Sequence, residues 1–262
     1  SVSLEYSTNG TRRKEFTVDQ TVVPLAKVGD WVEIRSRHTS QSMGNGNQKY
    51  NQFVLGGQVC VSGNIMSLLY RSFKRQTQVP PYGFKCLFAN QTGLTGSLKD
   101  LLMPFTTASD CCCHDMFRGT GVIDGPELPA TTLGKQSYRG MFYRCPQLIT
   151  APSLPATNLG EACYLAMFAY CTNLEAAPHL PATTLKSECY GYMFRGCPKM
   201  NAISLSYGGK FSPAYFAFWV DGVSQSGTFG YSGEDNTRGM DAIPTGWDVQ
   251  GRDEVVAPLK NK

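Results

Sequence analysis

Apolar and polar positions between about residues 83 and 206 recur with a period of 26 residues. In three ungapped copies, a Leu-Pro-Ala-Thr-x-Leu segment is followed by a Tyr, a Met-Phe pair, a Cys and a Leu or Met. These copies begin at Leu128, Leu154 and Leu180, and weaker copies precede them. A period of this length is typical of stacked repeats, in which each unit buries its apolar face against the next.

Each repeat has two parts with different backbone preferences. The first, such as residues 148–155, contains two prolines and is therefore expected to be extended. The second, such as residues 160–171, lacks proline, and its Cys163, Met167 and Cys171 are spaced by four. This spacing places apolar side chains on one face of a helix. We therefore predict a solenoid of the α/β class, with one extended segment and one short helix per repeat.

The repeat motif resembles a known family. The pattern L-x-x-A-P-x-L-P-A-T-x-L-x-x-x-C-Y-x-x-M-F-x-x-C-x-x-L resembles the BspA-like leucine-rich repeat, which has Ala-Phe where this chain has Met-Phe. Pro152, Pro178 and the 26-residue period make it a longer, proline-rich variant, similar to repeats in surface proteins of anaerobic gut bacteria and their phages. The resemblance covers roughly half of the chain. It implies a leucine-rich-repeat solenoid that serves for binding or display, without enzymatic activity or cofactor.

The flanking segments have strand-like patterns. Short alternating runs and turn signals predict a small all-β module, a sandwich, before the repeats, with a hairpin around Gly56-Gly57. The apolar residues 64–70 and 215–220 are expected to cap the two ends of the solenoid, because an open end must be covered. Two short strands are expected at residues 227–229 and 246–249. The predicted divisions are an N-terminal β module at residues 1–62, the solenoid with its first cap at residues 63–210, and a C-terminal β cap at residues 211–262.

Composition and charge mainly exclude functions. A net charge of +4 is too small for a dedicated nucleic-acid binder. No run of 18 apolar residues is present, so no transmembrane segment is expected. Residues 1–75 contain 10 Lys/Arg and 5 Asp/Glu, whereas residues 211–262 contain 4 and 7. The N-terminal part is thus mildly basic and the C-terminal part mildly acidic, which we interpret as solvated surface.

Ten cysteines raise the question of disulfides and metals. Most fall into two repeated columns, Cys163 and Cys189 in one, and Cys145, Cys171 and Cys197 in the other. Because packed helices lie about 8–10 Å apart, column neighbours are expected to be too distant for a disulfide. The run Cys111-Cys112-Cys113-His114-Asp115 offers several metal ligands, but successive helix positions point about 100° apart. We therefore predict buried, unpaired thiols and no metal site.

Catalytic motifs are missing. No P-loop, HExxH or GxSxG pattern occurs, and the three histidines are scattered. His179 occupies a repeat position held elsewhere by Glu127 and Ser153, which indicates a solvent-facing side chain. Four carboxylates lie close to one another in the C-terminal part of the sequence, and we interpret them as part of a polar loop; they are Asp221, Glu234, Asp235 and Asp241. An enzyme in the flanking segments stays open as an alternative, because paired carboxylates could carry out glycoside hydrolysis.

Repeat positions that vary beside the Met-Phe pair are rich in Arg and Tyr. These residue types are common at binding hot spots, and aromatic faces stack on sugar rings. The candidate binding residues are Arg118, Arg139, Tyr143, Arg144, Tyr170, Tyr192 and Arg195. We expect a non-catalytic scaffold, anchored at the outer membrane on the cell surface or secreted, that recognises a glycan or a protein. The alternative is a structural or receptor-binding component of a phage virion.

Overall fold

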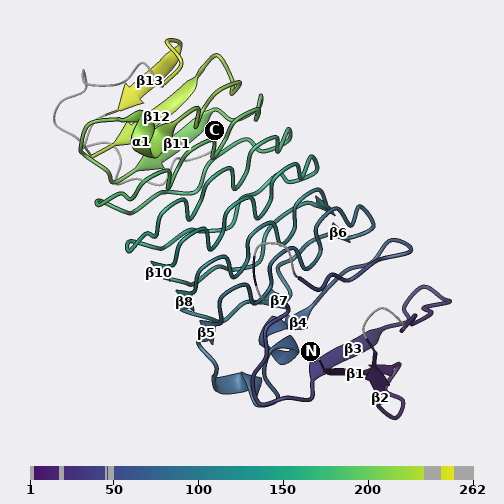
Figure 1. The fold of residues 1–262 in the computed structure, drawn as a ribbon. Helices are drawn as coiled ribbons and strands as arrows, with labels where there is room; N and C mark the ends of the chain where they lie inside the picture. The colour runs from purple at the N-terminus through teal and green to yellow at the C-terminus, as the bar shows by residue number, and fades with distance from the viewer. Residues whose placement is uncertain (1–2, 18–20, 45, 47–49, 233–242, 251–262) are drawn as a thin grey trace.

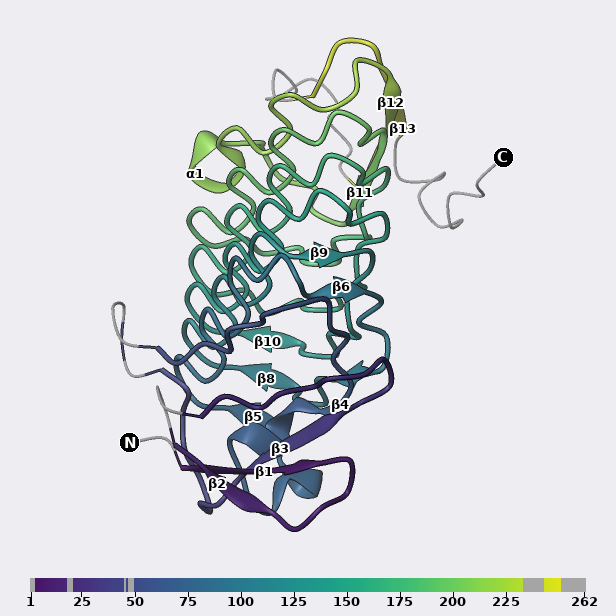
Figure 2. The same cartoon turned by 90° about the vertical axis from the view of Figure 1, so that its right-hand side faces the viewer.

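A computed structural model describes residues 3–17, 21–44, 46, 50–232 and 243–250. It is a stack of coils with a small antiparallel sheet at its N-terminal end (Figures 1 and 2). That sheet has the order β2-β1-β3 and consists of β1 (Leu4–Thr8), β2 (Lys14–Phe16) and β3 (Val32–Ser36). The remaining elements are β4 (Gly63–Asn64), η1 (Ile65–Leu68), η2 (Phe73–Arg75), β5 (Gln78–Val79), β6 (Thr95–Gly96), β7 (Leu101–Leu102), β8 (Thr107–Ala108), β9 (Gly121–Val122), β10 (Thr132–Leu133), β11 (Ala202–Leu205), α1 (Pro213–Phe216), β12 (Gly227–Tyr231) and β13 (Trp247–Gln250).

Parallel pairing joins each coil to its neighbour. The two-residue strands form the sheets β10-β8-β5, β4-β7 and β6-β9, and longer strands form β11-β12-β13 at the C-terminal end. Isolated parallel bridges, such as Asp124 with Thr150, continue the pairing where no strand is formed. Hydrogen-bonded strands lie about 4.8 Å apart, so the coils are stacked much more closely than packed helices would be.

The proline-free part of each repeat is a ribbon of overlapping turns. Every fourth residue has a positive φ, as at Ala162 (52°), Ala166 (54°) and Tyr170 (62°). Alternate N–H groups donate to the carbonyl three residues earlier, and the N–H groups between them donate to the following coil. The term turn ribbon is used below for this feature, whose six coils are residues 82–90, 111–119, 136–144, 162–170, 188–196 and 214–222.

The predicted helix in every repeat, and with it the α/β leucine-rich-repeat class, is wrong. In the part of the chain that the structure describes, the longest helices have four residues, α1 and η1. The spacing of Cys163, Met167 and Cys171 fits a backbone that repeats every four residues better than an α-helix, which drifts by about 40° at each such step. Five hydrogen bonds at each junction between coils replace the internal bonds of a helix, as between Phe168 N–H and the Met193 carbonyl (3.0 Å).

The turn ribbon directs two residues of every four into the core. As a consequence, aromatic rings at equivalent positions of successive coils contact one another and form ladders through the core. The rings of the longer ladder have centroids 5.5–6.3 Å apart and belong to Phe88, Phe117, Phe142, Phe168, Phe194 and Trp219. A second ladder, with spacings of 5.6–6.1 Å, contains Tyr138, Tyr164, Tyr190 and Phe216. Because each inner ring of a ladder touches rings of the coils before and after it, the ladders bind the stack into one core.

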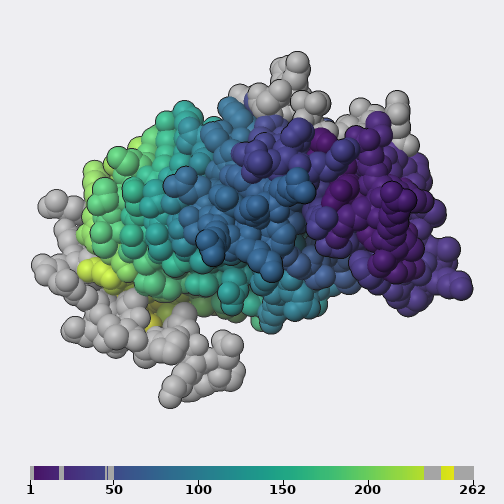
Figure 3. Space-filling model, turned by 90° about the horizontal axis from the view of Figure 1, so that it is seen from below, coloured from purple at the N-terminus to yellow at the C-terminus, as the bar shows by residue number. Residues whose placement is uncertain are grey.

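The N-terminal end is covered differently from the prediction. Residues 41–44 and 50–55 lie on the first coil, where Met43 N–H donates to the Gly83 carbonyl and Phe53 N–H to the Leu87 carbonyl (both 3.0 Å). The hairpin expected at Gly56-Gly57 is absent from this described segment, because Val59 pairs in parallel with the next coil instead. Among the described residues, one three-stranded sheet, not a sandwich, lies beyond. The N-terminal part of the chain forms the purple end of the molecule in Figure 3.

The C-terminal end contains the two expected strands as β12 and β13. The residues expected to cap this end, 215–220, all belong to the last coil of the turn ribbon. The sheet side of the stack therefore extends further than the ribbon side, since β13 pairs beyond β12 while no seventh ribbon coil is present among the described residues.

A glycine substitution is expected to change the free energy of unfolding in opposite directions in a turn ribbon and in a helix. We expect Ala166→Gly to raise the free energy of unfolding by about 0.5–1 kcal/mol, because Ala166 has a positive φ that glycine adopts without strain. In a helix the same change would lower it by about 1 kcal/mol. Ala169→Gly, three residues later and not at a positive φ, is the control and should destabilise. Urea denaturation of both variants measures the difference.

Candidate binding surface

The outward residues of the turn ribbon align in columns across the coils. They form the arginine–aromatic surface, defined here as Arg118, Tyr143, Arg144, Tyr170, Tyr192, Arg195 and Phe218. The first six belong to the set predicted from the sequence. Each is held by a coil whose backbone is fixed by turn and inter-coil hydrogen bonds, so their positions are set by the scaffold.

In the N-terminal half of this surface, guanidinium groups alternate with tyrosine rings. The Arg118 guanidinium lies 5.4 Å from the Tyr143 ring centroid. The Arg144 guanidinium lies 5.2 Å from Tyr143 and 5.6 Å from Tyr170, and the two rings meet edge to face at 5.6 Å. A Cβ on Gly196 (φ 68°) would lie 2.5 Å from the Tyr170 ring, so glycine leaves the space that this ring occupies.

The C-terminal half repeats the arrangement with different rings. Tyr192 and Phe218 stack with centroids 5.3 Å apart, and the Arg195 guanidinium lies 5.5 Å and 5.8 Å from them. Asp221 forms an ion pair with Arg195, with 3.0 Å between Asp221 Oδ2 and Arg195 Nε. Tyr170 is 36% exposed and Phe218 is 61% exposed, so ring faces are available to a ligand.

The three stacked arginines differ in charge compensation. Arg118 pairs with Asp115 at 3.4 Å and Arg195 pairs with Asp221. Arg144 has no ion pair within the described residues. A guanidinium stacked on rings keeps its N–H edge free for hydrogen bonds, so Arg144 is the cation best placed to meet an external acceptor.

Arg139, the seventh predicted residue, belongs to a different place. It lies in a polar cluster with His114 and Asp115, where its carbonyl accepts from Asp115 N–H at 2.9 Å. Burial lowers the pKa of His114 to about 3, and the charges of Lys85, Arg139 and Arg118 act in the same direction. These effects outweigh the Asp115 carboxylate, 3.6 Å from His114 Nε2, whose own pKa is raised by burial.

The sequence interpretation missed Phe218 and the polar cluster. Phe218 follows Tyr192 by 26 residues, so extending the repeat register by one copy would have identified it. His114 and Asp115 stand in the degenerate second copy, where no repeated motif marks them as neighbours of Arg139. His114 Nδ1 is buried and has no hydrogen-bond partner in the described structure. The cluster therefore holds a neutral imidazole.

All ten cysteines are free thiols in this structure, and only Cys60 is exposed. Disulfides were not expected because neighbouring repeats were assumed to lie about 8–10 Å apart, as packed helices do. That assumption was wrong, because hydrogen-bonded coils lie only about 4.8 Å apart. The thiols of Cys145, Cys171 and Cys197 lie 3.0–3.1 Å from the carbonyl oxygens of Phe117, Phe142 and Phe168, so each donates to the preceding coil. Burial raises the pKa of Cys145 to about 11, as expected for an unreactive thiol.

Thiol counting tests this account. We expect one thiol, that of Cys60, to react quickly with a thiol reagent in the native protein, and ten to react after denaturation without reductant. Cys60→Ser should leave no fast thiol and nine slow ones. Two or more thiols missing after denaturation would contradict unpaired columns.

The structure does not bring the other candidate residues, the possible metal ligands, His179 and the carboxylates, together into a site among the described residues. Among the described residues, no group of three or more His, Cys, Asp or Glu side chains could hold a metal ion. His179 Nδ1 and Nε2 lie 3.0 Å and 2.9 Å from the hydroxyls of Ser204 and Ser206 on the exposed sheet side. Of the four carboxylates considered, Asp221 pairs with Arg195, and three lie outside the described residues: Glu234, Asp235 and Asp241.

Comparisons with known proteins return nothing for this chain: no family model, no curated protein and no solved structure matches it. The BspA-like resemblance therefore stays a hypothesis that rests on the repeat motif. Within the described residues, no helix has the length and apolar character needed to cross a membrane.

Proposed function

We propose that this protein is a non-catalytic binding scaffold, anchored at a cell surface or secreted, that recognises a glycan or a protein through the arginine–aromatic surface. The observation that carries the proposal is Arg144, whose guanidinium lies against the Tyr143 and Tyr170 rings and has no ion pair in the described part. Ring faces suit the apolar faces of sugars or a peptide, and the guanidinium supplies hydrogen bonds to acceptors.

Rigidity supports the same proposal. The arginine–aromatic surface lies outside a core whose ring ladders and inter-coil hydrogen bonds hold every coil in place. A preformed surface loses little conformational entropy when a ligand binds. The resemblance of the repeat motif to bacterial surface proteins supports the proposed location.

A binding assay with single variants tests the proposal. Glycan arrays and capture by candidate surface proteins would first identify a ligand. We then expect Tyr170→Ala and Arg144→Ala to weaken binding about tenfold or more, with unchanged thermal unfolding. Tyr50→Ala, at a 45% exposed tyrosine near the N-terminal end, is the matched control. Binding that both surface variants retain in full would refute the proposed surface.

Fractionation of the source material separates the proposed location from the virion alternative. Peptides of this protein should concentrate in the outer-membrane or secreted fraction. Concentration in purified virions would favour a structural or receptor-binding particle component, and the ligand would then be sought on the bacterial envelope.

A further inference from the structure

The hydrogen-bond pattern of the turn ribbon breaks at its last coil. In the five earlier coils, alternate N–H groups donate to the following coil, as Tyr192 and Phe194 do to Ala217 and Trp219. In the last coil the corresponding donors are the N–H groups of Phe218, Val220 and Gly222, and none of them has an acceptor in the described structure. The stack therefore ends in a row of unpaired donors, comparable to the free edge of a β-sheet.

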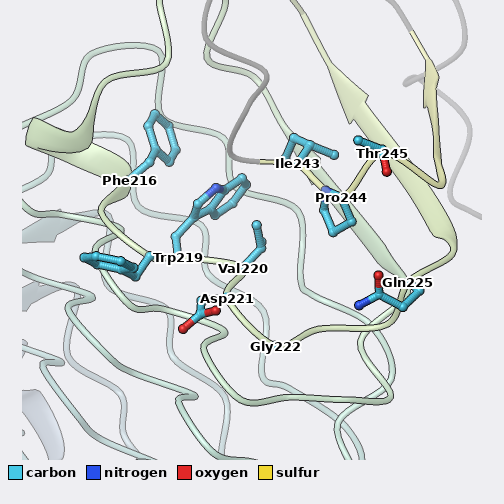
Figure 4. A pocket seen from close by; sticks show the side chains of 10 residues that line it. Phe216, Trp219, Val220, Asp221, Gly222, Gln225, Ile243, Pro244 and Thr245 are labelled. Carbon is cyan, nitrogen blue, oxygen red and sulfur yellow. The ribbon is translucent and has the colours of Figure 1, made fainter.

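A cavity of about 500 Å³ lies beside this open edge (Figure 4). Phe216, Trp219 and Val220 of the last coil line one side, and Ile243 and Pro244 line the other. The indole Nε1 of Trp219 is buried and has no hydrogen-bond partner among the described residues. The lining also contains the 61% exposed Phe218 and the polar side chains of Asp221, Gln225 and Thr245. The end of the stack thus offers N–H donors and one exposed ring, and a complementary ligand must bring carbonyl acceptors and an apolar side chain.

The N-terminal module contains a segment with those complementary properties. Residues 21–26 have no regular secondary structure, and the backbone groups of residues 22–25 form no hydrogen bond in the described structure. The side chain of Val22 is 86% exposed, and that of Val28, in the turn that follows this segment, is fully exposed. In an extended chain alternate carbonyls point to the same side, which matches the alternate donors of the open edge.

We propose that copies of this protein associate head to tail, with residues 21–26 of one copy adding to the open edge at residues 218–222 of the next. The added segment continues the inter-coil interface that the chain already forms five times. Charge favours this pairing, because residues 1–75 carry 10 Lys/Arg and 5 Asp/Glu while residues 211–262 carry 4 and 7. Such a contact joins different surfaces, so repeating it produces a filament or a closed ring.

Sedimentation velocity of the full chain at rising concentration tests the proposal. We expect the average mass to increase with concentration, and to increase less in 1 M salt, which screens the attraction between the ends. The double variant Val22→Asp/Val28→Asp should raise the dissociation constant at least about tenfold, because it buries carboxylates at the contact, beside the Phe218 ring and Asp221. Val54→Asp, at an 83% exposed valine outside the segment, is the control and should associate like the wild type.

A peptide provides a measurement that does not depend on filament formation. A synthetic peptide of residues 21–28 should bind one site on the Val22→Asp/Val28→Asp variant, whose open edge is intact, and should dissolve wild-type assemblies. Calorimetry measures the first effect and sedimentation the second. A wild-type chain that stays monomeric at all concentrations, assemblies that the double variant leaves unchanged, or a peptide that does not bind would each overturn the proposal.

Discussion

We expect Phe168→Ala to lower the free energy of unfolding by about 3–5 kcal/mol, the largest effect of any single change considered. Phe168 is fully buried, with ring centroids 5.7 Å from Phe142 and 5.8 Å from Phe194 and nearly parallel planes. Removing the ring leaves a cavity at two junctions. Inter-coil hydrogen bonds on both sides of Phe168 fix the spacing of the coils, so the cavity cannot close by collapse.

Urea denaturation with the denaturant dependence fitted for each variant measures this loss. Phe218→Ala is the matched control, because Phe218 is 61% exposed and lies outside the ladder. We expect that control to change the free energy of unfolding by less than about 1 kcal/mol. A loss below about 1 kcal/mol for Phe168→Ala would show that the ladder is not the core of the stack.

The sequence predicted which side chains are buried, and it failed on the backbone that buries them. Met167, Phe168 and Cys171 are all buried in the structure, as their repetition indicated. A pattern of burial does not report φ, and Ala162 and Ala166 give no sign that they adopt positive values. The strain at such residues is offset by hydrogen bonds to coils 25 or 26 residues away, which local pattern analysis does not include.

The same distinction applies to the candidate surface. Tyr143, Arg144 and Tyr170 were selected as variable positions, and the structure brings them together because the coils repeat in register. Arg139 was selected by the same argument but lies one turn earlier, beside His114. One turn along the ribbon moves a side chain into a different column, and only the four-residue turn geometry shows which column that is.

The polar cluster should make stability depend on pH through His114. Its pKa is lowered from 6.5 to about 3 in the folded state, so the folded protein keeps this imidazole neutral while the unfolded chain takes up a proton below about pH 6.5. The stabilising contribution is complete above pH 6.5 and is lost as the pH falls toward 3. At pH 5 the loss is about 2 kcal/mol.

Comparison with His114→Gln isolates this contribution, because Gln does not titrate. We expect the difference in unfolding free energy between wild type and His114→Gln to shift by about 2 kcal/mol between pH 7.5 and 5, in favour of the variant at the lower pH. Asp115, whose raised pKa acts in the opposite direction, is present in both proteins and largely cancels, as does the lowered pKa of His179. A difference that stays constant with pH would mean that His114 is protonated to the same extent in the folded and unfolded states, and that the cluster is open to water.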